Sequence, residues 1–344
     1  MNHKLMKWVI SSNMRVELIN FLYKTKNKKF FFQEIADRKK VSLFNYTKLI
    51  EPLPYVPTEL VIDNNLYGIA YALKKYAGID TNKSLDAYIE HGIFFGNLVR
   101  DEQKIWNVSQ NITFSNIRKK HLLDSKIQKE ILPIGPFIHY AESLLNDDEL
   151  KELKSKMGRV LLVFPSHSII GVNSSFSHDD FIKEIERIRK DFDTVLVSLY
   201  WVDACKLNIL QTYEAKGYKV VTSGHRYDLY FLCRQKALIQ LADFTMSNSV
   251  GTHVGYCIYL NKPHYIYQQK IKNVGINERL QKHFDAVRNE EQLLTEEKEK
   301  NEIFSLFSKY QENISEEQYA IVDKYWGVSL LLSSDRLRDK LLVR

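Results

Sequence analysis

The second half of the chain alternates short apolar runs with segments whose apolar residues recur at helical spacing. The apolar runs predict buried strands at 159–164, 194–199, 219–222, 244–246 and 264–267. The amphipathic segments predict helices at 179–192, 207–216 and 229–242, and a further helix that begins near Val250. Nearly all-apolar strands that alternate with helices through short connections are typical of a parallel sheet covered on both faces. We therefore expect a doubly wound α/β domain here.

The first half repeats this plan less clearly. Its pattern predicts strands at 60–63, 87–91 and 111–115, a helix at 66–76 and a basic helix from Asn116. Residues 1–40 show no decisive period, and we expect them to be mostly helical. The proline and glycine residues within 131–137 predict an ordered linker between the two halves.

After Gln268 the chain becomes charged, with helices predicted at 290–309, 315–326 and 334–342. We therefore divide the chain into two domains, residues 1–135 and 136–285, and C-terminal helices, residues 286–344, that pack back toward the first domain. The expected fold class is α/β, with two facing doubly wound Rossmann-like domains and a C-terminal helical tail. Ligands of open parallel sheets bind beyond the carboxyl ends of the strands, so we expect a ligand between the two domains.

The composition restricts the class of protein without naming a ligand. The 344 residues are 44% hydrophobic and 26% charged, which suits a globular protein with two cores. The formal net charge of +7 is spread along the chain rather than gathered in a basic stripe, so an anionic membrane surface or substrate explains it as well as nucleic acid does. The three cysteines lack metal-site or disulfide spacing. Neither a signal peptide nor an apolar run of about 18 residues is visible, and we expect a cytoplasmic protein.

Polar side chains gather where the predicted strands end. In the second half these are, in chain order, Ser166, His167 and Ser168, then His225 and Arg226, then Ser247, Asn248 and Ser249. Thr252 and His253 follow at the start of the next helix. Because a helix start offers free backbone N–H groups and the positive end of the helix dipole, this last turn predicts an anion site.

Each of these side chains has a plainer alternative role. Ser247, Ser249 and Thr252 either donate to phosphate oxygens, which we favour, or cap the helix. His253 either supplies a charge or a hydrogen bond to a leaving phosphate or lies on the helix surface. Arg226 offers a bidentate fork for phosphate or carboxylate, or pairs with a neighbouring carboxylate. Residues 169–178, rich in small polar residues, are interpreted as a loop that closes over a ligand.

The two-domain arrangement resembles the GT-B class of glycosyltransferases. Residues 159–268 look like the bacterial capsule and lipopolysaccharide enzymes that use CMP-activated ulosonic acids, the Kdo transferases and sialyltransferases. In those families a His-containing motif and a Ser-rich motif bind the cytidine and phosphate of the donor, and Pro165-Ser-His-Ser168 and Ser247-Asn-Ser249 are the matching segments here. The sialyltransferase motif is normally His-Pro, whereas His167 precedes Ser168. The resemblance implies a glycosyltransferase for a surface polysaccharide, with residues 1–135 on the acceptor side and 136–285 holding the nucleotide sugar.

An inverting sugar transfer needs a general base within about 3 Å of the acceptor hydroxyl. We name His91 and Glu90 as candidate catalytic residues and prefer His91, with Asp63 and Asp203 as rivals. Ser115 and Arg118 are candidates for the acceptor side, although a charge run is also typical of a solvated helix face.

No metal site is expected, because no Asp-x-Asp element follows a predicted strand. We expect no cofactor beyond the nucleotide-sugar donor, which the resemblance makes CMP-linked. The expected partners are this donor, a glycan or lipid-linked glycan acceptor and, peripherally, the inner membrane; nucleic acid is not expected. A UDP- or GDP-sugar transferase and a nucleotide-sugar epimerase of the same shape stay open as alternatives. So does a non-enzymatic protein that binds a nucleotide sugar, a glycan or nucleic acid.

Overall fold

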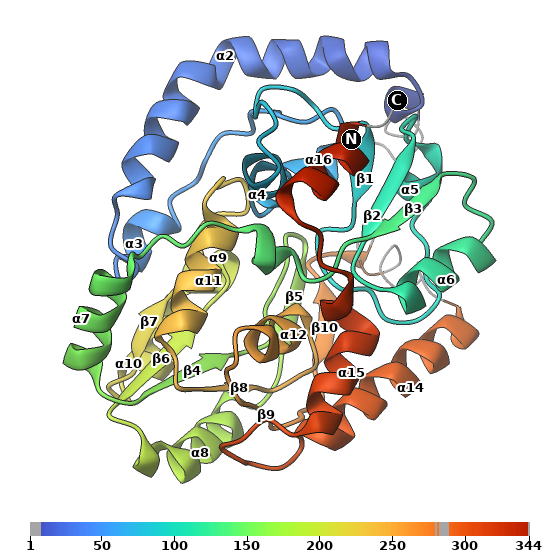
Figure 1. Ribbon diagram of the computed structural model, residues 1–344. Coiled ribbons are helices and arrows are strands. Elements are labelled where there is room, and N and C mark those ends of the chain that lie inside the picture. Colours follow the sequence, from blue (N-terminus) through green and yellow to red (C-terminus); the bar gives the residue numbers. More distant parts are fainter. Residues whose placement is uncertain (1–7, 279–280, 282–288, 343–344) are drawn as a thin grey trace.

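Two parallel β-sheets organise the protein. The computed structural model describes residues 8–278, 281 and 289–342 (Figure 1). The smaller sheet contains β1 (Ala87–Ile89), β2 (Gln110–Thr113) and β3 (Glu130–Pro133), paired in that order. The larger sheet contains β4 (Val160–Phe164), β6 (Thr194–Ser198), β7 (Lys219–Val221), β8 (Phe244–Ser247) and β9 (His264–Ile266). The predicted α/β class with parallel sheets is confirmed.

The larger sheet has the strand order β7-β6-β4-β8-β9, and all its pairs are parallel. Numbered along the chain, this is the 3-2-1-4-5 order of a doubly wound nucleotide-binding sheet. The chain leaves β4 toward β6 on one side and later returns to β8 on the other, so the direction of winding reverses between β4 and β8. The connecting helices are α8 (His178–Ile188), α9 (Trp201–Ala204), α10 (Leu207–Glu214), α11 (Phe231–Leu241) and α12 (Thr252–Tyr259), with the 3₁₀ turn η3 (Arg189–Asp191).

All five strands predicted for this half are confirmed, with both ends of each within two residues of the prediction. The nearly continuous apolar runs account for this agreement, since each strand is covered on both faces. The short antiparallel pair β5 (Val172–Ser175) and β10 (Lys272–Gly275) was not predicted. Strand β5 lies within 169–178, the segment interpreted as a closing loop.

Two predictions for the first half were wrong. Residues 60–63 are not a strand but lead into the 3₁₀ turn η1 (Ile62–Asn65). The side chain of Asn64 donates to the Ala87 carbonyl and accepts from the Ile89 amide, so it occupies the edge of β1 where a strand would pair. Residues 131–137 are not only a linker: Ile131 and Leu132 pair with β2 as part of β3, and η2 (Phe137–Tyr140) follows.

The helices of the first half pack around the smaller sheet. They are α2 (Asn13–Lys39), α3 (Tyr46–Leu49), α4 (Ile69–Tyr76), α5 (Asp101–Ile105) and α6 (Asn116–Asp124), and α7 (Asp147–Met157) leads into the second half. At α3 and the end of α2 they also pack against the second half. The mostly helical N-terminal segment is confirmed from Asn13 onward, and the helices expected near 66–76 and after 116 are present as α4 and α6. The largest buried apolar cluster contains residues of both sheets, such as Ile112 and Leu162.

The C-terminal helices touch both halves. They are α14 (Glu290–Phe307), α15 (Glu316–Trp326) and α16 (Ser334–Leu342), with η4 (Val328–Leu330) before the last. Trp326 of α15 lies directly against Gly255 of α12, where there is no room for a Cβ atom, and its indole N–H donates to the Thr252 carbonyl at 3.1 Å. The Ser334 hydroxyl of α16 donates to the Tyr76 carbonyl at the end of α4. The three domain boundaries stay predictions. Within the ranges described above, no helix has the length and apolar character needed to cross a membrane.

Candidate functional site

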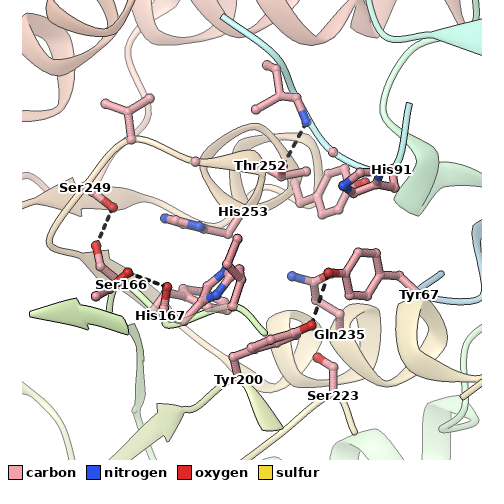
Figure 2. Close-up of a pocket in the computed structure, with 18 of the residues that line it drawn as sticks. Tyr67, His91, Ser166, His167, Tyr200, Ser223, Gln235, Ser249, Thr252 and His253 are labelled. Carbon is pink, nitrogen blue, oxygen red and sulfur yellow. Dashed lines mark hydrogen bonds between the residues drawn. The ribbon is translucent and has the colours of Figure 1, made fainter. Parts of the chain in front are cut away.

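A cavity of about 570 Å³ lies between the two halves of the protein (Figure 2). On one side it is lined by the residues that follow the carboxyl ends of β4, β6, β7 and β8. On the other side it is lined by Tyr67 and by the segment His91–Phe95, and α14 contributes Glu296 and Lys300. Of the residues proposed from the sequence, the lining includes His91, Ser166, His167, Ser249, Thr252 and His253.

The point where the sheet reverses its winding forms the floor of this cavity. Ser166 follows β4 and Ser249 follows the neighbouring β8, and their hydroxyl oxygens are 2.8 Å apart in a hydrogen bond. The Ser166 amide donates to Asn248 Oδ1 at 2.7 Å, and the Asn248 side chain donates to Gln269. Asn248 is fully buried, so it positions the two serines and does not itself reach the cavity.

Helix α12 begins at the cavity without a side-chain cap. Its N-cap residue is Gly251, and among the described residues no side-chain cap bond is made to its first turn. The capping role considered for Ser247, Ser249 and Thr252 is therefore excluded. The Thr252 hydroxyl instead accepts from the Ile93 amide at 3.0 Å, which joins the two halves across the cavity. The Val254 amide donates to the Gly251 carbonyl, and the amides of Thr252 and His253, which have no partner among the described residues, are left for a ligand or solvent.

The side chain of His253 lines the cavity, and one of its ring nitrogens has no partner within the described structure. Its ring stacks on Phe164 at 5.0 Å between centroids, and its Nε2 atom is buried without a hydrogen bond. Burial, with a smaller contribution from nearby His167, lowers the pKa of His253 to about 3, so the ring is neutral near pH 7. The alternative of a surface histidine is therefore wrong.

His167 faces the cavity beside Tyr200, with ring centroids 4.5 Å apart. Its Nδ1–H donates to the Ser168 carbonyl at 3.1 Å, which leaves Nε2 unprotonated in the neutral ring. Burial lowers the pKa of His167 as well. His167 thus offers a hydrogen-bond acceptor.

His91 lines the cavity from the first half, opposite these groups. Its Nδ1 atom is 4.0 Å from Asp63 Oδ2, and that carboxylate accepts from the Tyr88 hydroxyl at 2.7 Å. Burial lowers the pKa of His91, while the Asp63 carboxylate acts in the opposite direction. A neutral imidazole at this position has the protonation state of a general base near pH 7.

Glu90 does not share this position. Its backbone N–H donates to the Ile112 carbonyl, which continues the hydrogen-bond ladder of β1. Its side chain therefore points to the opposite face from that of His91. Its fully buried carboxylate accepts from Arg118, with the shortest distance 2.6 Å, and from Gln103 and Thr113. Glu90 therefore has a structural role, and its assignment as a base is withdrawn.

The acceptor-side candidates are also buried away from the cavity. Arg118 is bound to Glu90 and donates to the Gly96 carbonyl, and Ser115 caps α6 by accepting from the Arg118 amide. An ion pair at the helix start, rather than a solvated basic face, explains Arg118. Asp203, the rival base, accepts from the Ser168 amide and from Lys206, and it lies outside the cavity lining.

The remaining sequence candidates support the walls rather than line them. The Ser168 hydroxyl accepts from Lys206 and from the Ser174 amide. Ser247 is hydrogen-bonded to His264 and to the Ser249 carbonyl. His225 packs against Trp201 with their ring centroids 4.4 Å apart, and Arg226 donates to the Tyr227 hydroxyl at 2.7 Å. None of these side chains belongs to the lining of the cavity.

Sequence reasoning missed the aromatic wall that closes the cavity between the halves. The hydroxyls of Tyr67 and Tyr200 are hydrogen-bonded at 3.2 Å, and Phe231 packs against Tyr67. Tyr67 has a φ of 59°, and its amide donates to the Arg226 carbonyl at 2.7 Å, which holds the two halves together at this point. No local signal in the sequence marks Tyr67, because its hydrogen-bond partners, Tyr200 and Arg226, are more than 130 residues away.

The cavity also has two basic side chains, both from elements that the sequence did not associate with it. Arg100 lies 3.9 Å from Asp63, and Lys300 of α14 is paired with Glu296 at 2.6 Å. Within the part of the chain that the structure describes, no group of three or more His, Cys, Asp or Glu side chains is arranged to hold a metal ion.

Comparison with known proteins gives little independent information. No protein-family model matches the chain, and no curated protein matches it. Among solved structures, the wall teichoic acid polymerase TagF aligns at 14% identity with a TM-score of 0.39 over 70% of this chain. The alignment spans 64% of the TagF chain, less than two thirds of its length. The S. aureus MnaA–UDP co-structure aligns at 10% identity with a TM-score of 0.36, over 77% of this chain and 83% of that one. Likenesses this weak carry no functional argument, and the fold is established by the sheets of the chain itself.

Proposed function

We propose that this protein is a nucleotide-sugar-dependent glycosyltransferase of the GT-B arrangement. The observation that carries the proposal is the position of the 570 Å³ cavity at the switch point between β4 and β8. Nucleotides bind to doubly wound sheets of this strand order at that point. The first half of the chain faces the same cavity with a candidate base, His91, as a transfer between two bound substrates requires.

The donor phosphate binds at the start of α12. The uncapped N–H groups of this helix and the hydroxyls of Ser166 and Ser249 supply donors, and Thr252 can donate its remaining hydroxyl hydrogen. His253 has a ring nitrogen that no described residue occupies, and the free ring nitrogen of His167 can accept a hydrogen bond from another part of the donor. The helix N–H groups and the hydroxyls stabilise the charge that develops on the departing phosphate, so the proposed reaction needs no metal ion.

The acceptor binds on the side of the first half, where His91 removes a proton from its hydroxyl. Asp63 lies behind His91 and stabilises the imidazolium that forms in that step. The proposed acceptor is a glycan or a lipid-linked glycan.

The favoured donor is a CMP-activated ulosonic acid such as Kdo or a sialic-acid-like sugar. Its support is the resemblance of the two motifs that end in Ser168 and Ser249. Arg226, which the sequence suggested as the partner of the sugar carboxylate, lies outside the cavity, and Arg100 and Lys300 are the basic side chains available for it. A UDP- or GDP-sugar uses the same phosphate site, so transferases for those donors are the alternatives, together with a nucleotide-sugar epimerase.

Thermal unfolding of the full chain with CMP, UDP or GDP tests the proposal. A nucleotide at about 100 times its dissociation constant adds roughly 2.7 kcal/mol to the free energy of unfolding. Stabilisation by CMP alone supports the favoured donor, and stabilisation by UDP or GDP selects an alternative. Mass spectrometry of the products then separates a transferase, which extends an acceptor, from an epimerase, which returns an altered nucleotide sugar. Stabilisation by RNA or DNA but by no nucleotide overturns the proposal.

A further inference from the structure

The first long helix carries an apolar stripe that faces away from the protein. Met14, Leu18, Phe21 and Leu22 follow the i, i+4, i+7, i+8 spacing of one helix face, and they are between 60% and 76% exposed. The buried residues of α2, among them Val16 and Phe31, lie on other sides of the helix. Figure 1 shows α2 along the outer edge of the molecule. The helix is therefore held by one face while its apolar stripe has no cover from the described residues.

Basic side chains continue this face where the apolar stripe ends. The next two turns contain four lysines, Lys24, Lys26, Lys28 and Lys29. Because an α-helix rotates by about 100° per residue, Lys28 and Lys29 lie on the same side of α2 as Leu18. No ion pair between described residues involves any of these four lysines. Glu17 is the single acidic residue between Asn13 and Gln33. The outward face of α2, defined here as Met14, Leu18, Phe21, Leu22, Lys28 and Lys29, is thus apolar at one end and positive at the other.

We propose that the outward face of α2 docks the protein on an anionic lipid surface, with the helix lying in the plane of the interface. Apolar side chains of such a helix enter the boundary between headgroups and acyl chains, and flanking lysines bind anionic headgroups. The lysines prevent α2 from crossing the bilayer, in agreement with the absence of a spanning helix among the described residues. This proposal does not depend on what the cavity binds.

The charges distinguish a lipid surface from a second copy of this chain. Two copies that paired through the outward face would bring together two surfaces that each carry lysines, with Glu17 the single acidic residue nearby on each helix. Such a pair would leave the lysines without opposite charges, whereas an anionic lipid surface supplies them.

Sedimentation of the full chain with lipid vesicles tests the proposal. The protein is expected to bind vesicles of phosphatidylglycerol and phosphatidylcholine, to bind phosphatidylcholine alone much more weakly, and to dissociate as salt is added. Two variants of α2 are each expected to bind anionic vesicles at least about tenfold more weakly than the wild type. They are the apolar variant Leu18→Ser/Phe21→Ser and the charge variant Lys28→Gln/Lys29→Gln.

Control variants carry Leu→Ser or Lys→Gln substitutions at exposed sites outside α2. Leu207→Ser and Lys151→Gln/Lys190→Gln are expected to bind vesicles as the wild type does. Unchanged melting temperatures show that all variants are folded. The proposal is overturned if the wild type ignores anionic vesicles or if both α2 variants bind like the wild type. It is also overturned if light scattering shows a dimer that the α2 variants dissociate, because the face then belongs to a second copy.

Discussion

The hydroxyls of Ser166 and Ser249 meet at 2.8 Å although 83 residues separate them in the chain. They meet because β4 and β8 are neighbours in the sheet while the segments after them diverge, one toward β5 and the other into α12. The gap that this divergence opens is the floor of the cavity. The pair thus marks the point at which sheet topology, rather than a local motif, creates a place for a ligand.

The first prediction concerns the phosphate site. Ser249→Ala removes a hydroxyl that we expect to donate to phosphate, and it should weaken nucleotide binding by about tenfold, the value of one typical hydrogen bond to a charged group. Calorimetric titration of the variant measures this loss, and its melting temperature should stay close to that of the wild type. Ser305→Ala, an exposed serine on α14, is the matched control and should bind nucleotide normally. Equal affinity for Ser249→Ala would remove this hydroxyl from the site.

A second prediction follows from the pKa of His91. Because burial lowers it below its usual value of 6.5, the ring stays neutral as the pH falls through that value, and kcat/KM should decline only at lower pH. The Asp63 carboxylate favours the protonated ring, so Asp63→Asn should lower this pKa further and move the acid limb of the profile to lower pH. A profile measured on both proteins checks the direction of the shift. Movement toward higher pH contradicts the assignment of His91 as the base.

Replacement of His91 gives a separate test of the same residue. His91→Gln should reduce kcat by about 10² to 10⁴, the usual contribution of a general base, with a smaller change in nucleotide affinity. Steady-state kinetics and a nucleotide titration separate the two effects. A variant with unchanged kcat would transfer the role of base to another group.

The ion pair between Glu90 and Arg118 should matter for stability rather than for catalysis. Arg118→Met leaves the Glu90 carboxylate buried without its partner and should cost about 3–5 kcal/mol of unfolding free energy. The double variant Glu90→Leu/Arg118→Met removes both charges and should be less destabilised than the single variant. Denaturant unfolding measures this order. The reverse order would show that the two charges do not act as a pair.

Metal removal is predicted to leave activity unchanged. The proposed site stabilises the charge of the departing phosphate with helix N–H groups and hydroxyls. Transfer activity after dialysis against EDTA should therefore equal that of the untreated protein. A loss of activity that Mg²⁺ or Mn²⁺ restores would contradict this part of the proposal.

The sequence predicted the larger sheet well because its strands are buried on both faces and read as unbroken apolar runs. The same runs located Ser166, His167 and Ser249 at strand ends, and the cavity contains all three. Residues 60–63 look like a strand, but the downstream Asn64 side chain occupies the edge of β1 that they would need. Tyr67 escaped prediction because its position depends on contacts between the two halves, which have no period and no local spacing.

The central claim is that the start of α12 binds the phosphate of a nucleotide, and one calorimetric comparison tests it most directly. CMP, UDP and GDP are titrated into the full chain beside cytidine, uridine and guanosine, which lack the phosphate. The account predicts that one nucleotide binds and that its nucleoside binds at least about tenfold more weakly, because the charge-assisted hydrogen bonds at Ser249 and the helix start are lost. Equal binding of nucleotide and nucleoside, or no binding of any of the six, would contradict it.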